Sequence, residues 1–327
     1  VHAEDGIRDL DSCLVGSEMC IRDRSCNGPG LSGRMSVNTE AAVMVNGDIT
    51  DRVSSQDRGL LYGDGVFETF SIEQGIPRFW QRHITRLLVG CERLGIIGVD
   101  ADTLYEEARI LAGGYDRCVL KLIITRGTGG RGYGTGDSGQ PTRILQRHTA
   151  PEYPDACRAD GVRVRCCQSR LSHNPRLACI KHLNRLEQVL ARSEWDDPEI
   201  REGLVFDADG RLVEGTMSNV FLLLNERLVT PDLSRCGVAG VMRSVVMELA
   251  GQSGLAVHRQ TVSRDQLVQA DEVFLTNSLL GIWPVCRIDD RDYSAGPATR
   301  QLQTALAGLV EEGSGWVCDV EQRGLHG

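Results

Sequence analysis

Lys181 lies in a sequence context that could lower the pKa of its side-chain amine. The four residues before it, Leu177-Ala-Cys-Ile180, are apolar, and the apolar residues after it have the spacing of a helix that starts just after the lysine. A lysine held partly out of water has a lowered pKa, and its neutral amine is then available for Schiff-base chemistry. A surface lysine at the start of a helix would show the same pattern, so these residues alone leave both interpretations open.

Three other features have the composition of anion-binding elements. Arg86 falls on the polar side of a predicted helix, and Gly240-Val241 opens another helix, whose N-terminus can bind an anion. The glycine-rich stretch Arg126–Gly136 follows a predicted buried strand, but it lacks the Gly-Lys-Ser/Thr ending of a P-loop. Arg86 could also be an ordinary exposed arginine, and the glycine-rich stretch could be a simple connecting loop.

The histidines and cysteines do not form a recognisable catalytic frame. His83, His173 and His182 are candidate acid-base groups, but packed or exposed structural histidines fit the sequence as well. The 12 cysteines have irregular spacing and no Cys-x-x-Cys pair. We therefore predict free thiols in a reducing cytoplasm, and no metal site, disulfide framework or cysteine nucleophile.

The composition is that of a soluble globular protein. The chain has 327 residues, 41% of them hydrophobic and 25% charged, and its net charge of -9 comes from scattered acidic residues. Such a charge gives no reason to expect a nucleic acid or an anionic membrane as a partner. No window approaches the length of a membrane span and the N-terminus lacks a signal-peptide core, so we predict a cytoplasmic protein.

The residues before Met35 differ from the rest of the chain. They show no clear periodicity, and we expect residues 1–34 to be a non-native or disordered prefix. From Met35 on, short strands and helices alternate, which predicts an α+β (mixed α/β) fold. The polar, proline-containing segment 149–160 is the best candidate linker, so we predict two domains, a smaller one at 35–148 and a larger one at 161–320.

Hydrophobic periodicity and turn residues locate the individual elements. Hairpins are predicted at 43–49 and 203–214, with turns at Asn46-Gly47 and Asp209-Gly210. Helices are predicted at 84–94, after Lys181, after Gly240 with Gly254 as its stop, and from Ser263. The remaining strands are predicted at 65–72, 118–125, 162–166, 219–224, 257–262 and 272–276.

Four segments together resemble one known family in the same order along the chain. They are Leu61-Tyr-Gly-Asp-Gly-Val-Phe-Glu-Thr69, His83-Ile-Thr-Arg-Leu87, Ile180-Lys-His-Leu-Asn-Arg-Leu-Glu-Gln-Val189 and Glu214-Gly-Thr-Met-Ser-Asn-Val220. This pattern resembles the fold-type IV pyridoxal-phosphate enzymes, the family of the branched-chain aminotransferases. The resemblance covers about Met44 to Val285, and it implies the two-domain fold of that family.

The resemblance assigns cofactor roles to particular residues. Lys181 matches the lysine that carries pyridoxal 5'-phosphate, and Glu214 matches the carboxylate that pairs with the protonated ring nitrogen. Arg86, in the His-x-x-Arg-Leu context, and the helix start at Gly240-Val241 match the phosphate site. Thr276 and Asn277 after the last buried strand resemble the remaining cofactor contacts.

Within the family, the strings are most similar to the aminodeoxychorismate lyases. The expected reaction converts 4-amino-4-deoxychorismate to 4-aminobenzoate and pyruvate in folate biosynthesis, with Lys181 as Schiff-base lysine and acid-base group. Gly130-Arg-Gly-Tyr133 resembles a substrate-facing segment, so Arg131 and Tyr133 are the expected substrate-binding residues. A D-amino-acid or branched-chain aminotransferase is the alternative, and a homodimer is implied by the resemblance alone.

Overall fold

The computed structural model describes residues 42–136 and 139–311, and all of these fall within a single compact unit. The predicted prefix at 1–34 lies outside the described residues, as does the end of the chain after residue 311. The described helices and strands form a mixed α/β structure with two sheets, which confirms the predicted fold class. Within this part of the chain no helix has both the length and the hydrophobicity that crossing a membrane requires.

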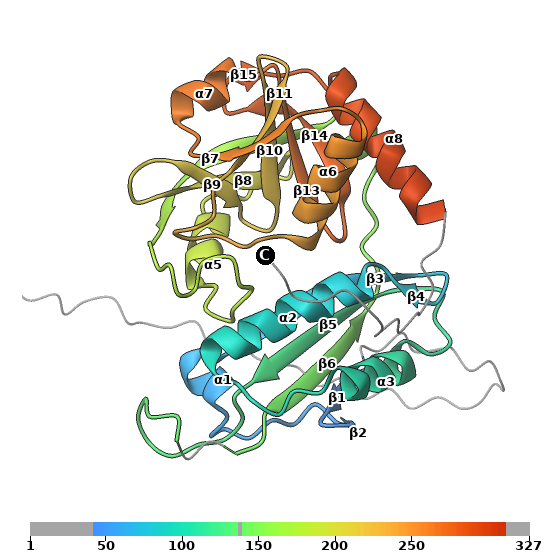
Figure 1. The fold of residues 1–327 in the computed structure, drawn as a ribbon, viewed down its shortest axis with the longest axis vertical. Coiled ribbons are helices and arrows are strands. Elements are labelled where there is room, and N and C mark those ends of the chain that lie inside the picture. The colour runs from blue at the N-terminus through green and yellow to red at the C-terminus, as the bar shows by residue number, and fades with distance from the viewer. Residues whose placement is uncertain (1–41, 137–138, 312–327) are drawn as a thin grey trace, which may run out of the picture. The chain divides into compact units, whose positions relative to one another are not determined.

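The first sheet is antiparallel throughout and has six strands in the order β2-β1-β6-β5-β3-β4. The strands are β1 (Val43–Val45), β2 (Asp48–Ile49), β3 (Gly65–Glu73), β4 (Ile76–Pro77), β5 (Arg117–Thr125) and β6 (Thr142–His148). Helices α2 (Trp80–Leu94) and α3 (Ala101–Ala112) lie along this sheet (Figure 1). Alternate residues of β3, among them Val66, Phe70 and Ile72, are buried in the core that the two helices share with the sheet.

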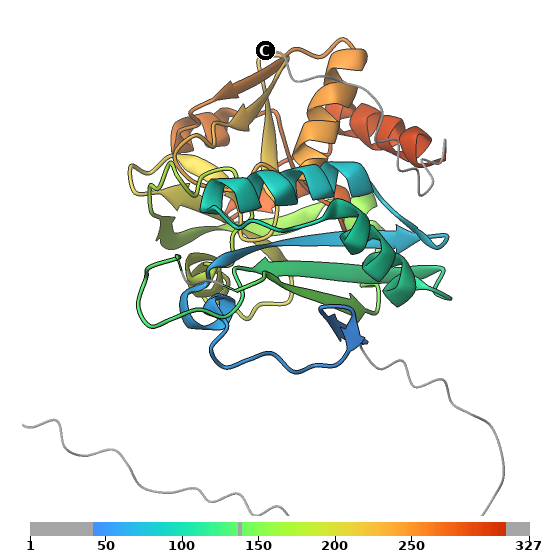
Figure 2. The same ribbon diagram turned by 60° about the horizontal axis from the view of Figure 1, so that its bottom comes forward.

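The second sheet is mixed and has nine strands, with β12-β11-β10-β13-β14-β7-β8-β9 in order and β15 paired to β14. The strands are β7 (Val162–Leu171), β8 (Ile200–Asp207), β9 (Leu212–Gly215), β10 (Asn219–Leu224), β11 (Arg227–Pro231), β12 (Val257–Gln260), β13 (Glu272–Asn277), β14 (Gly281–Ile288) and β15 (Arg291–Asp292). Helices α6 (Val241–Gln252) and α8 (Pro297–Glu311) pack on its core strands around the stacked rings of Phe221 and Phe274. The rotated view in Figure 2 shows α6 and α8 together on this sheet.

Four short helices lie in the connections: α1 (Arg58–Tyr62), α4 (Asp155–Ala159), α5 (Leu186–Arg192) and α7 (Arg264–Gln269). Helix α4 falls inside the predicted linker, which itself runs between the last strand of the first sheet and the first strand of the second. The proposed domain boundary at 149–160 stays a prediction.

Most of the predicted elements are confirmed. The hairpin at 43–49 forms as β1 and β2, with Asn46 and Gly47 in the left-handed conformations that such a turn requires. Helix α2 ends at Gly95, and α6 begins after Gly240. The hairpin of β8 and β9 turns at Gly210, and Ser263 caps α7.

Two predictions about elements were wrong. No helix starts directly after Lys181: α5 begins at Leu186, because the backbone around the lysine pairs with β3 instead. Thr276 and Asn277 are the last residues of β13, and β13 is not the last buried strand, since β14 follows it. The sequence patterns yielded no prediction for the longer elements α3, α8, β6, β11 and β14, or for the short elements α1, α4, β4 and β15.

Candidate active site

One cavity of about 660 Å³ lies beside Lys181, in the size range of small-molecule sites. Its walls come from α2, the Lys181 segment and α5, the β9–β10 turn, the start of α6 and the β13–β14 turn. It brings together all the residues predicted to contact the cofactor, namely Arg86, Lys181, Glu214, Gly240, Val241, Thr276 and Asn277. These residues span almost 200 positions of sequence, roughly from Arg86 to Asn277, so only the fold can bring them together.

Backbone pairing with β3 holds Lys181 on one side. The Phe67 N–H donates to the carbonyl of Lys181 at 2.9 Å, and the Leu183 N–H donates to the carbonyl of Gly65 at 2.9 Å. The lysine is therefore part of a short ladder rather than of a helix, which explains why the helix prediction failed at this point.

A second backbone segment is bonded to the chain just before Lys181. Cys179 donates its N–H to the carbonyl of Gly237 at 2.9 Å, and Ala239 donates to the carbonyl of Cys179 at 3.0 Å. Cys179 takes a left-handed conformation, with φ of 70°, that is uncommon for a non-glycine residue. The lysine backbone is thus fixed from both sides, which limits the positions its amine can reach.

The amine of Lys181 lies in a poorly solvated environment. Its Nζ atom is 4.5 Å from the centroid of the Phe67 ring. Burial and the nearby Arg86 cation lower the pKa of Lys181 to about 8, although Glu68 and Glu214 oppose this change. A substantial fraction of the amine is therefore neutral near physiological pH, as Schiff-base formation requires.

Glu214 supplies a buried carboxylate to the same cavity. It lies in β9, is 4% exposed, and its Oε2 accepts a hydrogen bond from the Val238 N–H at 2.8 Å. Burial raises the pKa of Glu214, while that hydrogen bond and the Arg185 and Lys181 cations counteract the rise. A cationic ring nitrogen beside this carboxylate would complete its charge pairing.

Arg86 is fixed by a fully buried carboxylate that sequence reasoning missed. Glu68 accepts hydrogen bonds from Nε of Arg86 at 2.7 Å and from Nδ1 of His83 at 2.7 Å, and it also bonds Arg86 Nη2. Burial by itself would raise the pKa of Glu68, but Arg86 and His83 outweigh it and lower that pKa to about 2. Arg86 Nη1 donates to the carbonyl of Ala239 at 2.9 Å, so the guanidinium joins α2 to the loop before α6.

The start of α6 is shaped by Asn219, which sequence reasoning also missed as a positioning residue. Its Oδ1 accepts from the Gly240 N–H at 3.1 Å, and its Nδ2 donates to the carbonyl of Val238 at 2.9 Å. A Cβ atom on Gly240 would lie 2.0 Å from Asn219 Oδ1, so only glycine fits. The first N–H groups of a helix have no partner inside the helix, and here they border the cavity close to Arg86.

Thr276 and Asn277 line the cavity, but their side chains are engaged within the protein. The Thr276 hydroxyl donates to the carbonyl of Gly281 at 2.7 Å, and Asn277 Nδ2 donates to the carbonyl of Met217 at 3.0 Å. The next residue, Ser278, places its hydroxyl 3.2 Å from His83 Nε2. The two predicted residues thus shape the β13–β14 turn, and their contact with a cofactor stays a prediction.

Glu202 organises another wall of the cavity and was not predicted. This buried carboxylate accepts hydrogen bonds from the backbone or hydroxyl groups of Thr216, Met217 and Ser218, all of which line the cavity. Burial raises the pKa of Glu202, and these hydrogen bonds oppose the rise. The turn between β9 and β10 is therefore folded around a single buried side chain.

The predicted substrate residues Arg131 and Tyr133 do not line this cavity. Both are exposed, and Tyr133 is 84% exposed. Arg58 anchors their loop, because its Nη1 donates to the carbonyl of Gly132 at 3.0 Å and its Nη2 to that of Tyr133 at 3.4 Å. Substrate binding by the two residues stays a prediction.

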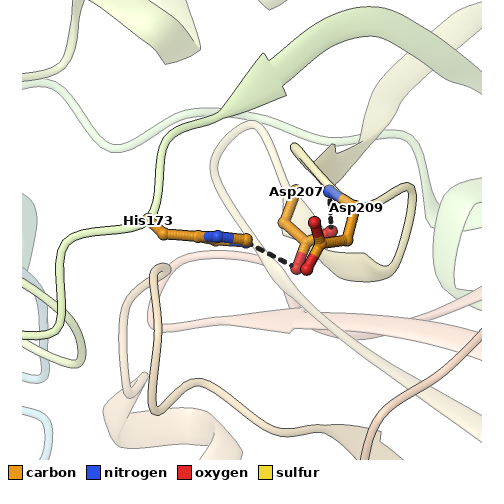
Figure 3. A group of neighbouring side chains, drawn as sticks. All are labelled: His173, Asp207 and Asp209. Atoms are coloured by element: carbon orange, nitrogen blue, oxygen red, sulfur yellow. Dashed lines mark hydrogen bonds and ion pairs between the residues drawn. The ribbon is translucent and has the colours of Figure 1, made fainter.

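His173, Asp207 and Asp209 form a cluster away from the cavity lining (Figure 3). His173 Nε2 lies 2.9 Å from Asp207 Oδ2. Arg235 donates to Asp209 Oδ2 at 2.7 Å and reaches His173 Nδ1 at 3.0 Å, so a protein cation already pairs with Asp209. This arrangement favours a structural role at the β8–β9 turn.

The eight cysteines of the described residues are free thiols.

Comparison with known proteins places the site in a family context. A family model described as amino-transferase class IV matches residues 65–288. The chain is 35% identical to an aminodeoxychorismate lyase from Vibrio harveyi over 266 residues, which cover 80% of this chain and 98% of the relative. It is 30% identical to a D-alanine aminotransferase from Bacillus licheniformis over 295 residues, or 82% of this chain and 96% of that one. The crystal structure of 4-amino-4-deoxychorismate lyase from Pseudomonas aeruginosa is similar at 46% identity and a TM-score of 0.79, over 81% of this chain and 98% of that chain.

Proposed function

The chain belongs to the class IV aminotransferase family, and from this premise we propose that it is an aminodeoxychorismate lyase that uses pyridoxal 5'-phosphate. The reaction converts 4-amino-4-deoxychorismate to 4-aminobenzoate and pyruvate. The observation that carries the proposal is the Lys181 amine, with a pKa of about 8, in a cavity that also presents Glu214 and Arg86. The identity to two lyases, 35% and 46%, is higher than the 30% identity to the D-alanine aminotransferase, and this favours the lyase reaction over amino transfer.

The residues of the cavity fit pyridoxal phosphate in charge and in chemical type. A buried amine, a buried carboxylate and an arginine beside a helix N-terminus are the partners that its aldehyde, ring nitrogen and phosphate need. Gly240 supports the phosphate end, since its missing side chain keeps the backbone close to Asn219. Lys181, Glu214, Arg86 and the Gly240-Val241 helix start would hold the cofactor in these roles.

When bound, pyridoxal phosphate withdraws electrons from the carbon that carries the substrate amine. Glu214 stabilises the protonated ring nitrogen on which that withdrawal depends, because its carboxylate is buried and already oriented by Val238. Arg86 holds the phosphate, with Glu68 and the Ala239 carbonyl fixing its guanidinium. Both side chains are held by hydrogen bonds within the protein, which favours orientation of the reacting atoms.

Lys181 performs the proton transfers. Its neutral amine removes the proton from the ring carbon that bears the substrate nitrogen, while the ring bond to the enolpyruvyl oxygen breaks. The electron pair of the broken carbon–hydrogen bond becomes part of the aromatic ring, and the enolpyruvyl group departs with the bonding pair of the carbon–oxygen bond. Protonation of the departing group gives pyruvate, and Lys181 is positioned to return that proton. Its pKa of about 8 suits both directions of transfer.

We extend the proposal to the substrate and to the oligomer. Arg131 and Tyr133 bind the substrate, on the basis of their Gly-Arg-Gly-Tyr segment. The protein is a homodimer, because Leu186, Val189 and Leu190 of α5 are 69%, 59% and 55% exposed, an apolar face beside the cavity. Free thiols are compatible with a cytoplasmic enzyme of folate biosynthesis.

A coupled assay on the purified protein tests the function. Lactate dehydrogenase reports pyruvate formed from enzymatically generated 4-amino-4-deoxychorismate, and chromatography measures 4-aminobenzoate in the same samples. We expect the two products in equal amounts. Borohydride reduction followed by peptide mass spectrometry should find the cofactor attached at Lys181.

An aminotransferase is the second candidate function, favoured by the 30% identity to D-alanine aminotransferase. It predicts amino transfer from D-alanine or a branched-chain amino acid to a keto acid, and no 4-aminobenzoate. A covalently bound cofactor together with only that activity would replace the lyase proposal and leave the role of Lys181 intact.

A further inference from the structure

Arg185 is a cavity residue with an unsatisfied cationic donor. Its Nε donates to the carbonyl of His182 at 2.8 Å, but its Nη2 is buried and has no hydrogen-bond partner among the described residues. Burial lowers the pKa of Arg185, and Glu214 and Glu187 only oppose this change through space. A buried charged donor without a partner is strongly destabilising, so a ligand that accepts a hydrogen bond from this Nη2 would be stabilised in the cavity.

Gln188, one helical turn further along, is unsatisfied in the same way. It lines the same cavity, and its Oε1 is buried without a hydrogen-bond partner among the described residues. Arg185 is the N-cap residue directly before α5, Gln188 lies in the first turn of α5, and both line the same cavity. Rotation of the Gln188 amide by about 180° exchanges the positions of its Oε1 and Nε2 atoms, and in the rotated amide Nε2 would offer two N–H donors to the same ligand.

Other cations of the cavity are already engaged. Arg86 is bonded to Glu68 and to the Ala239 carbonyl beside the helix α6 start, where the phosphate belongs. Arg192 donates to the carbonyl of Trp195 at 2.9 Å and stacks on its ring, with its guanidinium carbon 4.5 Å from the ring centroid. Among the described arginines that line the cavity, Arg185 is therefore the one with a buried N–H group that lacks a hydrogen-bond partner.

We propose that Arg185 and Gln188 form a carboxylate-binding subsite for the substrate. This inference rests on the proposed function, because 4-amino-4-deoxychorismate carries two carboxylates, and the exposed Arg131 supplies a partner for no more than one of them. Guanidinium N–H groups and an amide N–H match the planar oxygens of a carboxylate. The subsite lies at the start of α5, whereas the proposed phosphate anchors are Arg86 in α2 and the start of α6, so the two sets of residues come from different walls of the cavity.

The test compares Arg185→Gln and Arg185→Lys with Arg176→Gln in the holoenzyme. Arg176 is an exposed arginine outside the cavity lining and serves as the matched control. Chorismate is the binding probe, because it has both carboxylates of the proposed substrate but a hydroxyl in place of the amine and is not turned over. We expect Arg185→Gln to weaken chorismate binding roughly tenfold to a hundredfold, the usual effect of losing a charge-assisted hydrogen bond, with a smaller loss for Arg185→Lys.

Kinetics on 4-amino-4-deoxychorismate separate a binding role from a structural one. We expect KM to rise by a similar factor in Arg185→Gln while kcat changes much less, and Arg176→Gln to match the wild type in both measurements. Chorismate binding within twofold of the wild type in Arg185→Gln would overturn the inference. Loss of the cofactor absorbance band in that variant would also overturn it, because Arg185 would then serve the cofactor.

The inference and the proposed function fail in different ways. If the wild type makes pyruvate and 4-aminobenzoate but Arg185→Gln does so with an unchanged KM, the lyase assignment stands and the subsite is wrong. If the wild type makes no pyruvate yet binds chorismate in a manner that Arg185→Gln abolishes, the subsite stands and the lyase assignment is wrong. A wild-type holoenzyme that does not bind chorismate at all would refute the subsite directly.

Discussion

Replacing Glu68 with glutamine should destabilise the protein, since its charge fixes Arg86 and His83. The pKa of Glu68 falls from 4.5 to about 2 in the folded protein. Each pKa unit corresponds to about 1.4 kcal/mol, so the charge contributes about 3 kcal/mol to the free energy of unfolding at neutral pH. The side chain is fully buried, and solvent screening does not reduce this value.

The sign of the pH dependence follows from the same shift. A carboxyl group with a lowered pKa in the folded state stabilises the protein above its unfolded pKa, and this contribution disappears as the pH falls toward the folded pKa. The difference in unfolding free energy between the wild type and Glu68→Gln should therefore be constant above about pH 6 and shrink as the pH falls below about 4.5.

Glu73→Gln is the matched control, because Glu73 lies on the same strand and pairs with Arg78 at 2.8 Å but is 43% exposed. Urea unfolding monitored by circular dichroism measures all three proteins between pH 4 and 8. We expect a loss of about 3 kcal/mol for Glu68→Gln and less than about 1 kcal/mol for Glu73→Gln. Equal effects of the two substitutions would refute the argument that the buried carboxylate holds Arg86 in place.

Three further perturbations test other parts of the site. Gly240→Ala should weaken cofactor binding by roughly tenfold or more, because the added Cβ would lie 2.0 Å from Asn219 Oδ1. Absorbance titration measures this binding. Gly251→Ala is the control, because a Cβ at Gly251 in α6 would meet nothing within 4 Å and should leave binding unchanged. Lys181→Met should raise the unfolding free energy of the cofactor-free protein at pH 7 by about 1–3 kcal/mol. The reason is that a lysine whose pKa is lowered by folding destabilises the folded state at any pH below that pKa. No gain in unfolding free energy at pH 7 would contradict a pKa near 8. Glu214→Gln should retain the cofactor but lower kcat by at least about tenfold, and an unchanged kcat would exclude Glu214 as the partner of the ring nitrogen.

Much of the candidate site could be predicted because its residues lie in distinctive local strings. Lys181, Glu214 and Arg86 are each embedded in a recognisable segment, and the fold then places all three in one cavity. Strands and helices with clear periodicity, such as β3 and α2, were also predictable from alternation and from the Gly95 stop.

The residues that support the site were missed because their partners are distant in sequence. Glu68 does carry a local signal, since it is a charged residue on the buried face of β3, between Val66 and Phe70. Its partner Arg86 contacts Ala239, which is 153 positions away, and no local pattern shows such a contact. The helix prediction after Lys181 failed for the same reason, because pairing with β3 outweighs the helical spacing.

The measurement that tests the central claim most directly is product formation by the wild type and Lys181→Ala with 4-amino-4-deoxychorismate. The account predicts pyruvate and 4-aminobenzoate in equal amounts from the wild type, and neither product above the uncatalysed background from a folded Lys181→Ala protein. Substantial turnover by Lys181→Ala, or amino transfer to a keto acid as the wild type's sole reaction, would contradict it.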